Sequence, residues 1–302
     1  MPDITINDHF SLENKVTLFK GDCFDMLREM PDECVDLIVT SPPYCMGKSY
    51  ENPKDDIDTF IEKHKRLFPE MYRVLRVGGS LCWQVGYHVK DGVVTPLDFV
   101  IYDIIRNHID KEISKDLFLR NRITWTFGHG LNNTNRFSGR HEVILWFTKG
   151  KEYSFDLNSV RIPQKYPGKK AYKGDNKGQY SGNPLGKNPS DVWDIPNVKA
   201  SHVEKTGHPC QFPVSIPQRL IKALSPVNGL VLDPFVGSGT SGIASILEGR
   251  KFVGSETNDK YYEIAYDRTE LALNGKVRIR EDKPVSKPDK KQSVARKPDN
   301  FV

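Results

Sequence analysis

The sequence predicts an α/β fold built on a parallel sheet, and three observations support this. Apolar runs of strand length alternate along the chain with stretches of helical periodicity. The run at residues 34–40 is almost continuously apolar and is followed by turn residues, as expected for a strand buried on both faces. A second apolar run, residues 230–232, leads into a glycine-rich turn and then a helical stretch, an arrangement typical of ligand-binding α/β sheets.

The same patterns place the individual elements. We expect the amphipathic stretch at residues 60–75 to be a helix that ends at Gly78-Gly79, since glycine commonly terminates helices. Because strands and helices alternate, we expect the strands to be parallel. The predicted strands are residues 16–19, 34–40, 80–85, 122–127, 142–148, 230–232 and 251–254. The predicted helical stretches are residues 24–30, 60–75, 97–108, 211–224, 241–248 and 260–273.

Bulk properties narrow the class of protein. The chain has 302 residues, 37% hydrophobic content and a formal net charge of +5, which is compatible with a polyanionic partner without proving one. It lacks the roughly 18 consecutive apolar residues of a membrane span, and residues 1–10 are polar and acidic, unlike a secretory signal. We therefore expect a cytoplasmic protein without a membrane partner. The cysteines lack metal-ligand spacing, so we expect reduced thiols and no metal site. They are Cys23, Cys34, Cys45, Cys82 and Cys210.

The most informative short motif is Thr40-Ser41-Pro42-Pro43-Tyr44, at the end of the strand predicted for residues 34–40. Two adjacent prolines hold the backbone extended, so that carbonyl groups point in fixed directions. Acceptors that bind an exocyclic amine, together with an aromatic ring that stacks on a base, would suit a flipped-out nucleotide. Taken alone, the motif is equally well explained as a strand-to-loop turn.

A second motif, residues 231–240, combines a strand, a glycine turn and the start of a helix. Glycines permit close approach of the backbone to a ligand, and Glu256 after the next strand is placed to accept from a ribose diol. No Gly-Lys-Ser/Thr follows, so the site suits a nucleoside better than a triphosphate. Asp22, just after another strand, would accept from an adenine amine, although an isolated Gly-Asp is more often a turn.

Taken together, these segments resemble the amino-methyltransferases of DNA in the beta arrangement, in which the Pro-Pro-Tyr segment precedes the Asp-Pro-Phe-x-Gly-x-Gly-Thr segment. The resemblance covers residues 16–149 and 190–273, and includes segments at residues 20–23, 75–79, 141–149, 191–196, 208–214 and 254–261. Phe212 is a departure, because lysine is common there. The resemblance implies a Rossmann-like sheet that binds S-adenosylmethionine, with residues 1–149 as the catalytic half and residues 191–275 as the cofactor-binding half of one domain.

The resemblance also implies residue roles. The catalytic segment is Ser41, Pro42, Pro43 and Tyr44. The cofactor-binding set is Asp22, Cys23, Thr40, Pro213, Asp233, Pro234, Phe235, Gly237, Gly239, Thr240 and Glu256.

The target base follows from the first residue of the catalytic segment. In the family this is usually Asp or Asn for adenine N6 and Ser for cytosine N4, so Ser41 favours cytosine, with adenine as the alternative.

An activated methyl donor requires neither a metal nor a covalent intermediate. Pro209-Cys210-Gln211 resembles the nucleophile motif of cytosine C5-methyltransferases, but there the cofactor loop lies well ahead of the cysteine, whereas here it follows. A DNA-binding relative without catalysis, and an RNA or protein methyltransferase, are further alternatives.

Residues 150–190 are rich in Lys, Gly, Asn, Pro and Tyr, and we interpret them as an insert that recognises the target DNA. The alternative is a solvated surface loop. Candidate DNA-binding residues are Arg136, Arg140, Lys169, Lys170 and Lys173. The tail, residues 276–302, is rich in Lys, Pro and Asp and is expected to be disordered. The expected partners are duplex DNA and, functionally, a cognate restriction endonuclease, for a monomer or homodimer.

Overall fold

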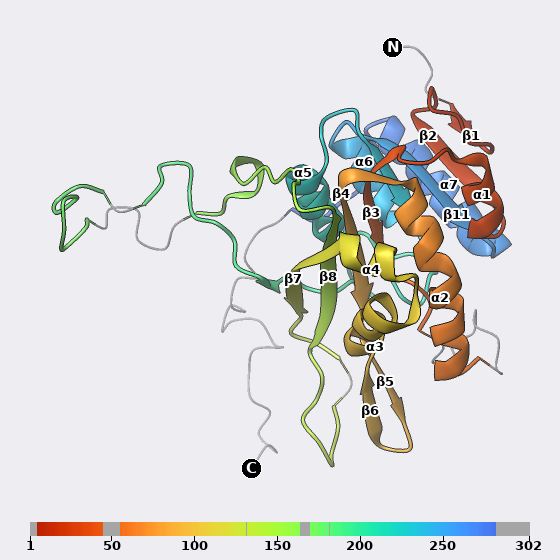
Figure 1. The fold of residues 1–302 in the computed structure, drawn as a ribbon, viewed down its shortest axis with the longest axis horizontal. Coiled ribbons are helices and arrows are strands. Elements are labelled where there is room, and N and C mark those ends of the chain that lie inside the picture. Colours follow the sequence, from red (N-terminus) through yellow and green to blue (C-terminus); the bar gives the residue numbers. More distant parts are fainter. Residues whose placement is uncertain (1–4, 45–54, 131, 164–169, 181, 282–302) are drawn as a thin grey trace.

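A nine-stranded sheet forms the centre of the computed structural model, within the part of the chain that it describes (residues 5–44, 55–130, 132–163, 170–180 and 182–281). The strand order is β1-β2-β11-β10-β3-β4-β8-β7-β9, and helices cover both faces (Figure 1). The predicted α/β class is therefore confirmed. Within the same described residues, no helix is long and apolar enough to span a membrane.

The observed elements follow the predicted ones closely. The sheet strands are β1 (Ile6–Asn7), β2 (Val16–Lys20), β3 (Val35–Thr40), β4 (Leu75–Val85), β7 (Leu117–Thr126), β8 (His141–Lys149), β9 (Val192–Asp194), β10 (Leu230–Asp233) and β11 (Lys251–Glu256). A separate hairpin pairs β5 (Tyr87–Lys90) with β6 (Val93–Pro96). The helices are α1 (Cys23–Glu29), α2 (Ile57–Val74), α3 (Leu97–Asp103), the π-helix η1 (Ile104–His108), α4 (Lys111–Asp116), the 3-10 turn η2 (Asn158–Val160), α5 (Ser215–Leu224), α6 (Thr240–Leu247) and α7 (Asp259–Leu273). The elements that the sequence patterns missed (β1, β5, β6, β9 and α4) have two to six residues, too few for a periodicity to emerge.

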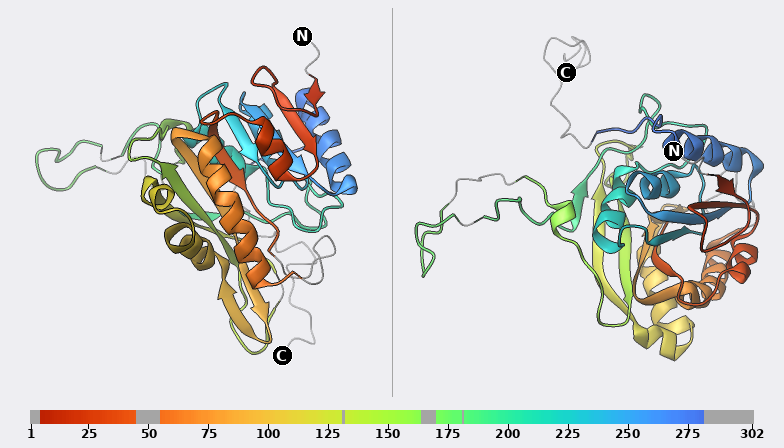
Figure 2. Two further views of the ribbon diagram at one scale, coloured as in Figure 1. Left: turned by 45° about the vertical axis from the view of Figure 1, so that its right-hand side comes forward. Right: turned by 90° about the horizontal axis from the view of Figure 1, so that it is seen from above.

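Alternation along the strands divides the core into two layers. In β8, Val143 and Leu145 face a cluster with α1, α2, α3 and η1, whereas Ile144 and Trp146 face a cluster with α5, α6 and α7. Figure 2 shows these two groups of helices on opposite sides of the sheet. Burial on both faces explains why the central strands read as apolar runs rather than as alternating patterns.

The sheet is mixed, which corrects the prediction of parallel strands. β8 runs antiparallel to both β4 and β7, while the other neighbouring strands pair in parallel. The physical reason is the connection between β7 and β8, in which the described residues, 127–130 and 132–140, contain no helix. A parallel pair requires a crossover, usually helical, whereas a loop returns the chain directly alongside.

The helix predicted for residues 60–75 is present, but the prediction that Gly78-Gly79 terminates it is wrong. Helix α2 ends at Val74, and β4 begins at Leu75 and continues through both glycines. Gly78 has a φ of +78°, and a side chain at Gly79 would come within 2.9 Å of the Arg76 carbonyl and 3.1 Å of the Asp36 carbonyl. Gly79 therefore allows β4 to approach β3 at an irregularity in their pairing, and Gly78 supplies a positive φ beside it. Neither glycine ends a helix.

Residues 150–190 contain little regular structure where they are described, and much of this segment extends away from the sheet (Figures 1 and 2). The expectation of disorder from residue 276 is wrong for residues 276–281. Val277 and Ile279 pack against the core, and the Arg280 amide donates to the buried Glu204 carboxylate at 2.9 Å. Two apolar side chains spaced two residues apart supply this anchoring in an otherwise polar sequence. The remainder of the tail lies outside the described residues.

The connections leave a crevice between β10 and β3. From β10 the chain passes through α6 to β11 on one side, and from β3 it passes through α2 to β4 on the other. Leu232 pairs with Ile38, so the loops that follow these two strands emerge side by side. Ligands of open α/β sheets bind at such a reversal of strand order.

Candidate functional site

A cavity of about 640 Å³ opens at the carboxyl ends of β3 and β10. This volume falls within the range of small-molecule sites. The cavity is lined by both segments that the sequence singled out, although they are almost 200 positions apart. The predicted site residues that line it are Ser41, Pro42, Pro43, Tyr44, Asp22, Cys23, Pro234, Phe235, Gly237, Thr240 and Glu256.

Four predicted cofactor residues lie beneath the cavity wall instead. Thr40, Pro213, Asp233 and Gly239 are buried and are not among the lining residues. The Thr40 hydroxyl donates to Asp233 Oδ1 at 2.6 Å, and the Phe235 amide donates to the same oxygen at 3.0 Å. These two bonds tie the end of β3 to the loop after β10. The structure thus places Asp233 where it joins the two halves of the site.

The glycine loop adopts backbone angles that only glycine takes easily. Gly237 has a φ of +54° and Gly239, which precedes helix α6, a φ of +81°. A side chain at Gly239 would lie 3.1 Å from the Ala265 Cα in helix α7. Gly239 therefore allows helix α7 to pack closely, whereas Gly237 faces the cavity.

Two acids stand at the end of the cavity nearest β11 and β2. Glu256, the last residue of β11, accepts from the amides of Gly237 (2.9 Å) and Asn258 (2.8 Å). Burial raises the pKa of its carboxyl group, and these two hydrogen bonds act in the opposite direction. Asp22 caps helix α1 by accepting from the Phe24 amide at 2.8 Å. Asp22 therefore serves as a helix cap and also lines the cavity.

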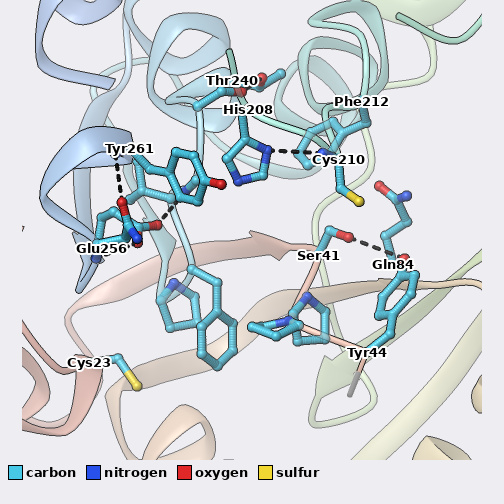
Figure 3. A pocket seen from close by; sticks show the side chains of 18 of the residues that line it. Cys23, Ser41, Tyr44, Gln84, His208, Cys210, Phe212, Thr240, Glu256 and Tyr261 are labelled. Carbon is cyan, nitrogen blue, oxygen red and sulfur yellow. Dashed lines mark hydrogen bonds between the residues drawn. The ribbon is translucent and has the colours of Figure 1, made fainter. Parts of the chain in front are cut away.

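The cysteines at the site differ in exposure. Cys23 is buried, and burial raises the pKa of its thiol to about 12, so that it remains protonated near neutrality. Cys210 is exposed and lines the cavity, with its amide donating to His208 Nδ1 at 3.3 Å. Burial lowers the pKa of His208 to about 4, so this ring is neutral, and it packs edge-on against Tyr261 (Figure 3).

The catalytic segment continues into residues that the sequence reasoning did not select. The hydroxyl groups of Ser41 and Tyr44 lie 3.2 Å apart (Figure 3). Tyr44 Oη also donates to Glu142 Oε2 at 3.5 Å, and Gln84 Nε2 donates to the same oxygen. Glu142 stands at the amino end of β8. Only because β8 is antiparallel does this end meet the carboxyl ends of β3 and β4, so the mistaken parallel assignment concealed it.

The predicted DNA-binding residues fall on two separate projections. Arg136 and Arg140 belong to the 127–140 loop, where Arg140 donates to the Gly139 carbonyl and to Asn132. Lys170 and Lys173 are exposed on the segment that extends from the sheet, with Lys170 over the ring of Tyr180. Figure 1 shows these projections leaving the body in different directions. Lys169 lies outside the described residues.

The sequence comparison decides the family, because the DNA methylase family model of N6 and N4 enzymes matches residues 35–267. The chain belongs to this DNA methylase family. A type II methyltransferase of Bacillus subtilis, M.BglII, is 42% identical over 86% of this chain and 71% of its own length. The DNA adenine methyltransferase YhdJ of Escherichia coli is 30% identical over 85% and 83%. The predicted family is therefore confirmed, and the relatives include an enzyme named for adenine.

Solved structures agree with this membership. PvuII DNA methyltransferase, described as cytosine-N4-specific, superposes with a TM-score of 0.64 at 19% identity, covering 90% of this chain and 94% of its own. At that identity the likeness concerns the fold alone. A DNA modification methylase of Thermus thermophilus, solved in complex with S-adenosyl-L-methionine, is 25% identical with a TM-score of 0.59, covering 85% and 96%. The DNA methylase therefore has the methyltransferase fold that the sequence predicted.

Proposed function

We propose that this DNA methylase transfers a methyl group from S-adenosylmethionine to the exocyclic N4 of a cytosine flipped out of duplex DNA. The observation that carries the proposal is Ser41, the first residue of the catalytic segment. Ser41 lines the same cavity as the glycine loop and lies within hydrogen-bond distance of Tyr44. In this family serine at that position usually accompanies cytosine N4.

The residues present fit S-adenosylmethionine. Glu256 and Asp22 are acceptors suited to a ribose diol and an adenine amine, and the loop at residues 234–237 has no side chain at Gly237 to obstruct a ligand. No lysine follows the glycine loop to bind a terminal phosphate. When bound, S-adenosylmethionine would supply a methyl group already activated by its sulfonium.

The chain's own residues would provide orientation and electrostatic stabilisation. The lone pair of an exocyclic amine is delocalised into the ring, so the nitrogen must be held with its N–H groups bound to acceptors. Ser41 Oγ and the Pro42 carbonyl would accept those two N–H groups and stabilise the positive charge that develops on nitrogen. The Tyr44 ring would stack on the base, and the rigid Pro42-Pro43 backbone keeps these groups in register.

We propose further that residues 150–190 recognise the target sequence. Tyr172 is 84% exposed, which leaves its ring open to nucleic acid, whereas Tyr180 is 69% exposed with Lys170 over its ring. Lys170 and Lys173 would contact phosphates. Arg136 and Arg140 would contact the DNA backbone from the 127–140 loop. Similarity to type II methyltransferases supports a role as the modification enzyme of a restriction–modification system, with a cognate endonuclease as functional partner.

The second candidate is the same reaction at adenine N6. The observation in its favour is the relationship to the adenine methyltransferase of Escherichia coli. Both targets are exocyclic amines next to a ring nitrogen, so the same acceptors would serve either one.

The test identifies the methylated nucleoside directly. The protein is incubated with labelled S-adenosylmethionine and DNA of mixed sequence, and the DNA is digested to nucleosides and separated. We expect N4-methyldeoxycytidine, and Ser41→Ala serves as the inactive control. Label in N6-methyldeoxyadenosine would overturn the assignment of the base in favour of the second candidate. Absence of label from DNA would overturn the proposed reaction itself.

A further inference from the structure

A carboxylate lies at the end of a hydrogen-bonded chain that begins at the catalytic segment. Ser41 Oγ and Tyr44 Oη are 3.2 Å apart, and Tyr44 Oη donates to Glu142 Oε2 at 3.5 Å. Gln84, whose residue is 5% exposed, donates its amide to the same carboxylate oxygen. All four residues line the cavity, and Figure 3 shows Ser41, Tyr44 and Gln84 gathered at one side of it. They come from the segment that follows β3, from β4 and from β8, so the chain of bonds exists only in the folded sheet.

The direction of these bonds follows from counting protons. An ionised carboxylate can only accept, and Tyr44 has one hydroxyl proton, which it donates to Glu142. In the bond between Ser41 and Tyr44 the proton must then come from Ser41. The lone pairs of Ser41 Oγ remain for the N–H of an exocyclic amine. If Glu142 were protonated, it could donate to Tyr44, and Tyr44 could donate to Ser41. The Ser41 proton would then point at the amine, so that Ser41 could not accept an N–H group.

We propose that ionised Glu142 is a positioning residue for methyl transfer: acting through Tyr44, it orients the Ser41 hydroxyl as an acceptor and receives the proton that the methylated amine releases. The proposal rests on the proposed function of the same site. It adds an acceptor for the proton that the methylated amine releases, because the catalytic segment alone offers only a weakly basic serine.

The step balances as follows. The amine lone pair forms the new N–C bond while the C–S bond breaks and its electron pair remains on sulfur, leaving a positive charge on nitrogen. One N–H proton moves to Ser41 Oγ, the Ser41 proton moves to Tyr44 Oη, and the Tyr44 proton moves to Glu142. The products are a neutral methylated base and a neutral carboxyl group, which loses its proton to solvent before the next turnover.

Burial of the Glu142 carboxyl raises its pKa, and the hydrogen bonds from Gln84 and Tyr44 act in the opposite direction. Arg140 and His141 precede Glu142 in the chain. The other titratable or charged groups that line the same cavity as Glu142 and Tyr44 are Asp22, Cys23, Asp55, Lys63, His64, Arg66, His208, Cys210, Glu256 and Tyr261. Because the pKa is raised, the accepting form is present at high pH and is lost as the pH falls. The rate of methyl transfer should therefore decrease on the acid side, at a higher pH than for an exposed glutamate.

The experiment measures single-turnover methyl transfer to DNA against pH, so that product release does not hide the chemical step. The variants are Glu142→Gln, Tyr44→Phe and the double variant, and Glu112→Gln, at an exposed position of helix α4, is the matched control. We expect Glu142→Gln to slow transfer on the order of 100-fold and to remove the acid limb of the pH profile. Cofactor affinity and the KM for DNA should be unchanged. Adding Tyr44→Phe should slow transfer little further, because residues acting as one chain are not additive.

Two results would overturn the inference. One is an acid limb that persists in Glu142→Gln with a rate near that of Glu112→Gln. The other is a rate loss matched by equal losses of thermal stability and cofactor affinity, which would indicate a structural role. Failure of the proposed function can be distinguished from failure of this inference. If the wild-type product is N6-methyladenine, the assignment of cytosine is wrong, but the same variants still test the role of Glu142 in methylation of the adenine amine.

Discussion

Asp233 should make the folded protein less stable at high pH, and Asp233→Asn should remove that effect. The carboxyl group is buried, with 1% of the residue exposed, and burial raises its pKa from 3.8 to about 6. A folded-state pKa above the unfolded one means that the folded protein binds the proton more tightly. The stabilisation from protonation is complete below the unfolded pKa and is lost as the pH rises through the folded pKa.

The magnitude follows from the shift. About 2 pKa units at 1.36 kcal/mol per unit correspond to a loss of about 3 kcal/mol between pH 4 and pH 7. Asparagine keeps an oxygen at Oδ1, the atom that accepts from both Thr40 and Phe235, so the variant should retain those bonds. We therefore expect Asp233→Asn to match wild type near pH 4 and to be more stable by about 3 kcal/mol above pH 7.

The assay is urea unfolding followed by tryptophan fluorescence at pH 4, 5, 6, 7 and 8, with the free energy of unfolding extrapolated to water. Other groups also titrate in this range, notably His208, whose pKa is lowered, so the difference between the two proteins is the quantity to compare. A difference that stays constant from pH 4 to pH 8 would refute the reasoning, because it would show that Asp233 has the same pKa in both states.

Three further predictions test separate features. Gly239→Ala should lower the free energy of unfolding in urea by about 1–2 kcal/mol more than Gly275→Ala. Both glycines have positive φ, but a methyl group at Gly239 would lie 3.1 Å from the Ala265 Cα in helix α7, whereas Gly275 has open space around it. Cys210→Ser should retain the rate of methyl transfer within about 2-fold, because methylation of an amine needs no thiolate nucleophile. Complete loss of methyl transfer would instead support Cys210 as the nucleophile of a C5-methyltransferase mechanism. The double variant Lys170→Gln, Lys173→Gln should weaken DNA binding equally for all DNA sequences. The slope of log affinity against log salt concentration, measured by fluorescence anisotropy, should fall by about 2. An unchanged slope would show that these lysines do not contact the DNA.

Much of the fold could be predicted because burial leaves a direct trace in the sequence. The central strands β3 and β10 lie between two layers of helices, so their sequences are runs of apolar residues bounded by turns. Short edge elements such as β9 leave no such trace, since its three residues form a strand only by pairing with β7. The role of Gly78 and Gly79 was wrong for a related reason. Local preference suggested that they end a helix, whereas Gly78 has a positive φ within β4 and Gly79 lies too close to β3 for a side chain.

The sequence of this DNA methylase was sufficient for its family, its α/β class and the two segments that line the cavity, because those features depend on local chemistry: a strand, then prolines or glycines, then a polar side chain. Tertiary structure decided what lies between those segments. It joined Thr40 to Asp233 across 193 positions and brought Glu142 to Tyr44 across 98. Strand order and direction determine such contacts, and an antiparallel β8 arises from the path of a loop rather than from any residue preference. For that reason Ser41 and Tyr44 could be found in the sequence, whereas their carboxylate partner could not.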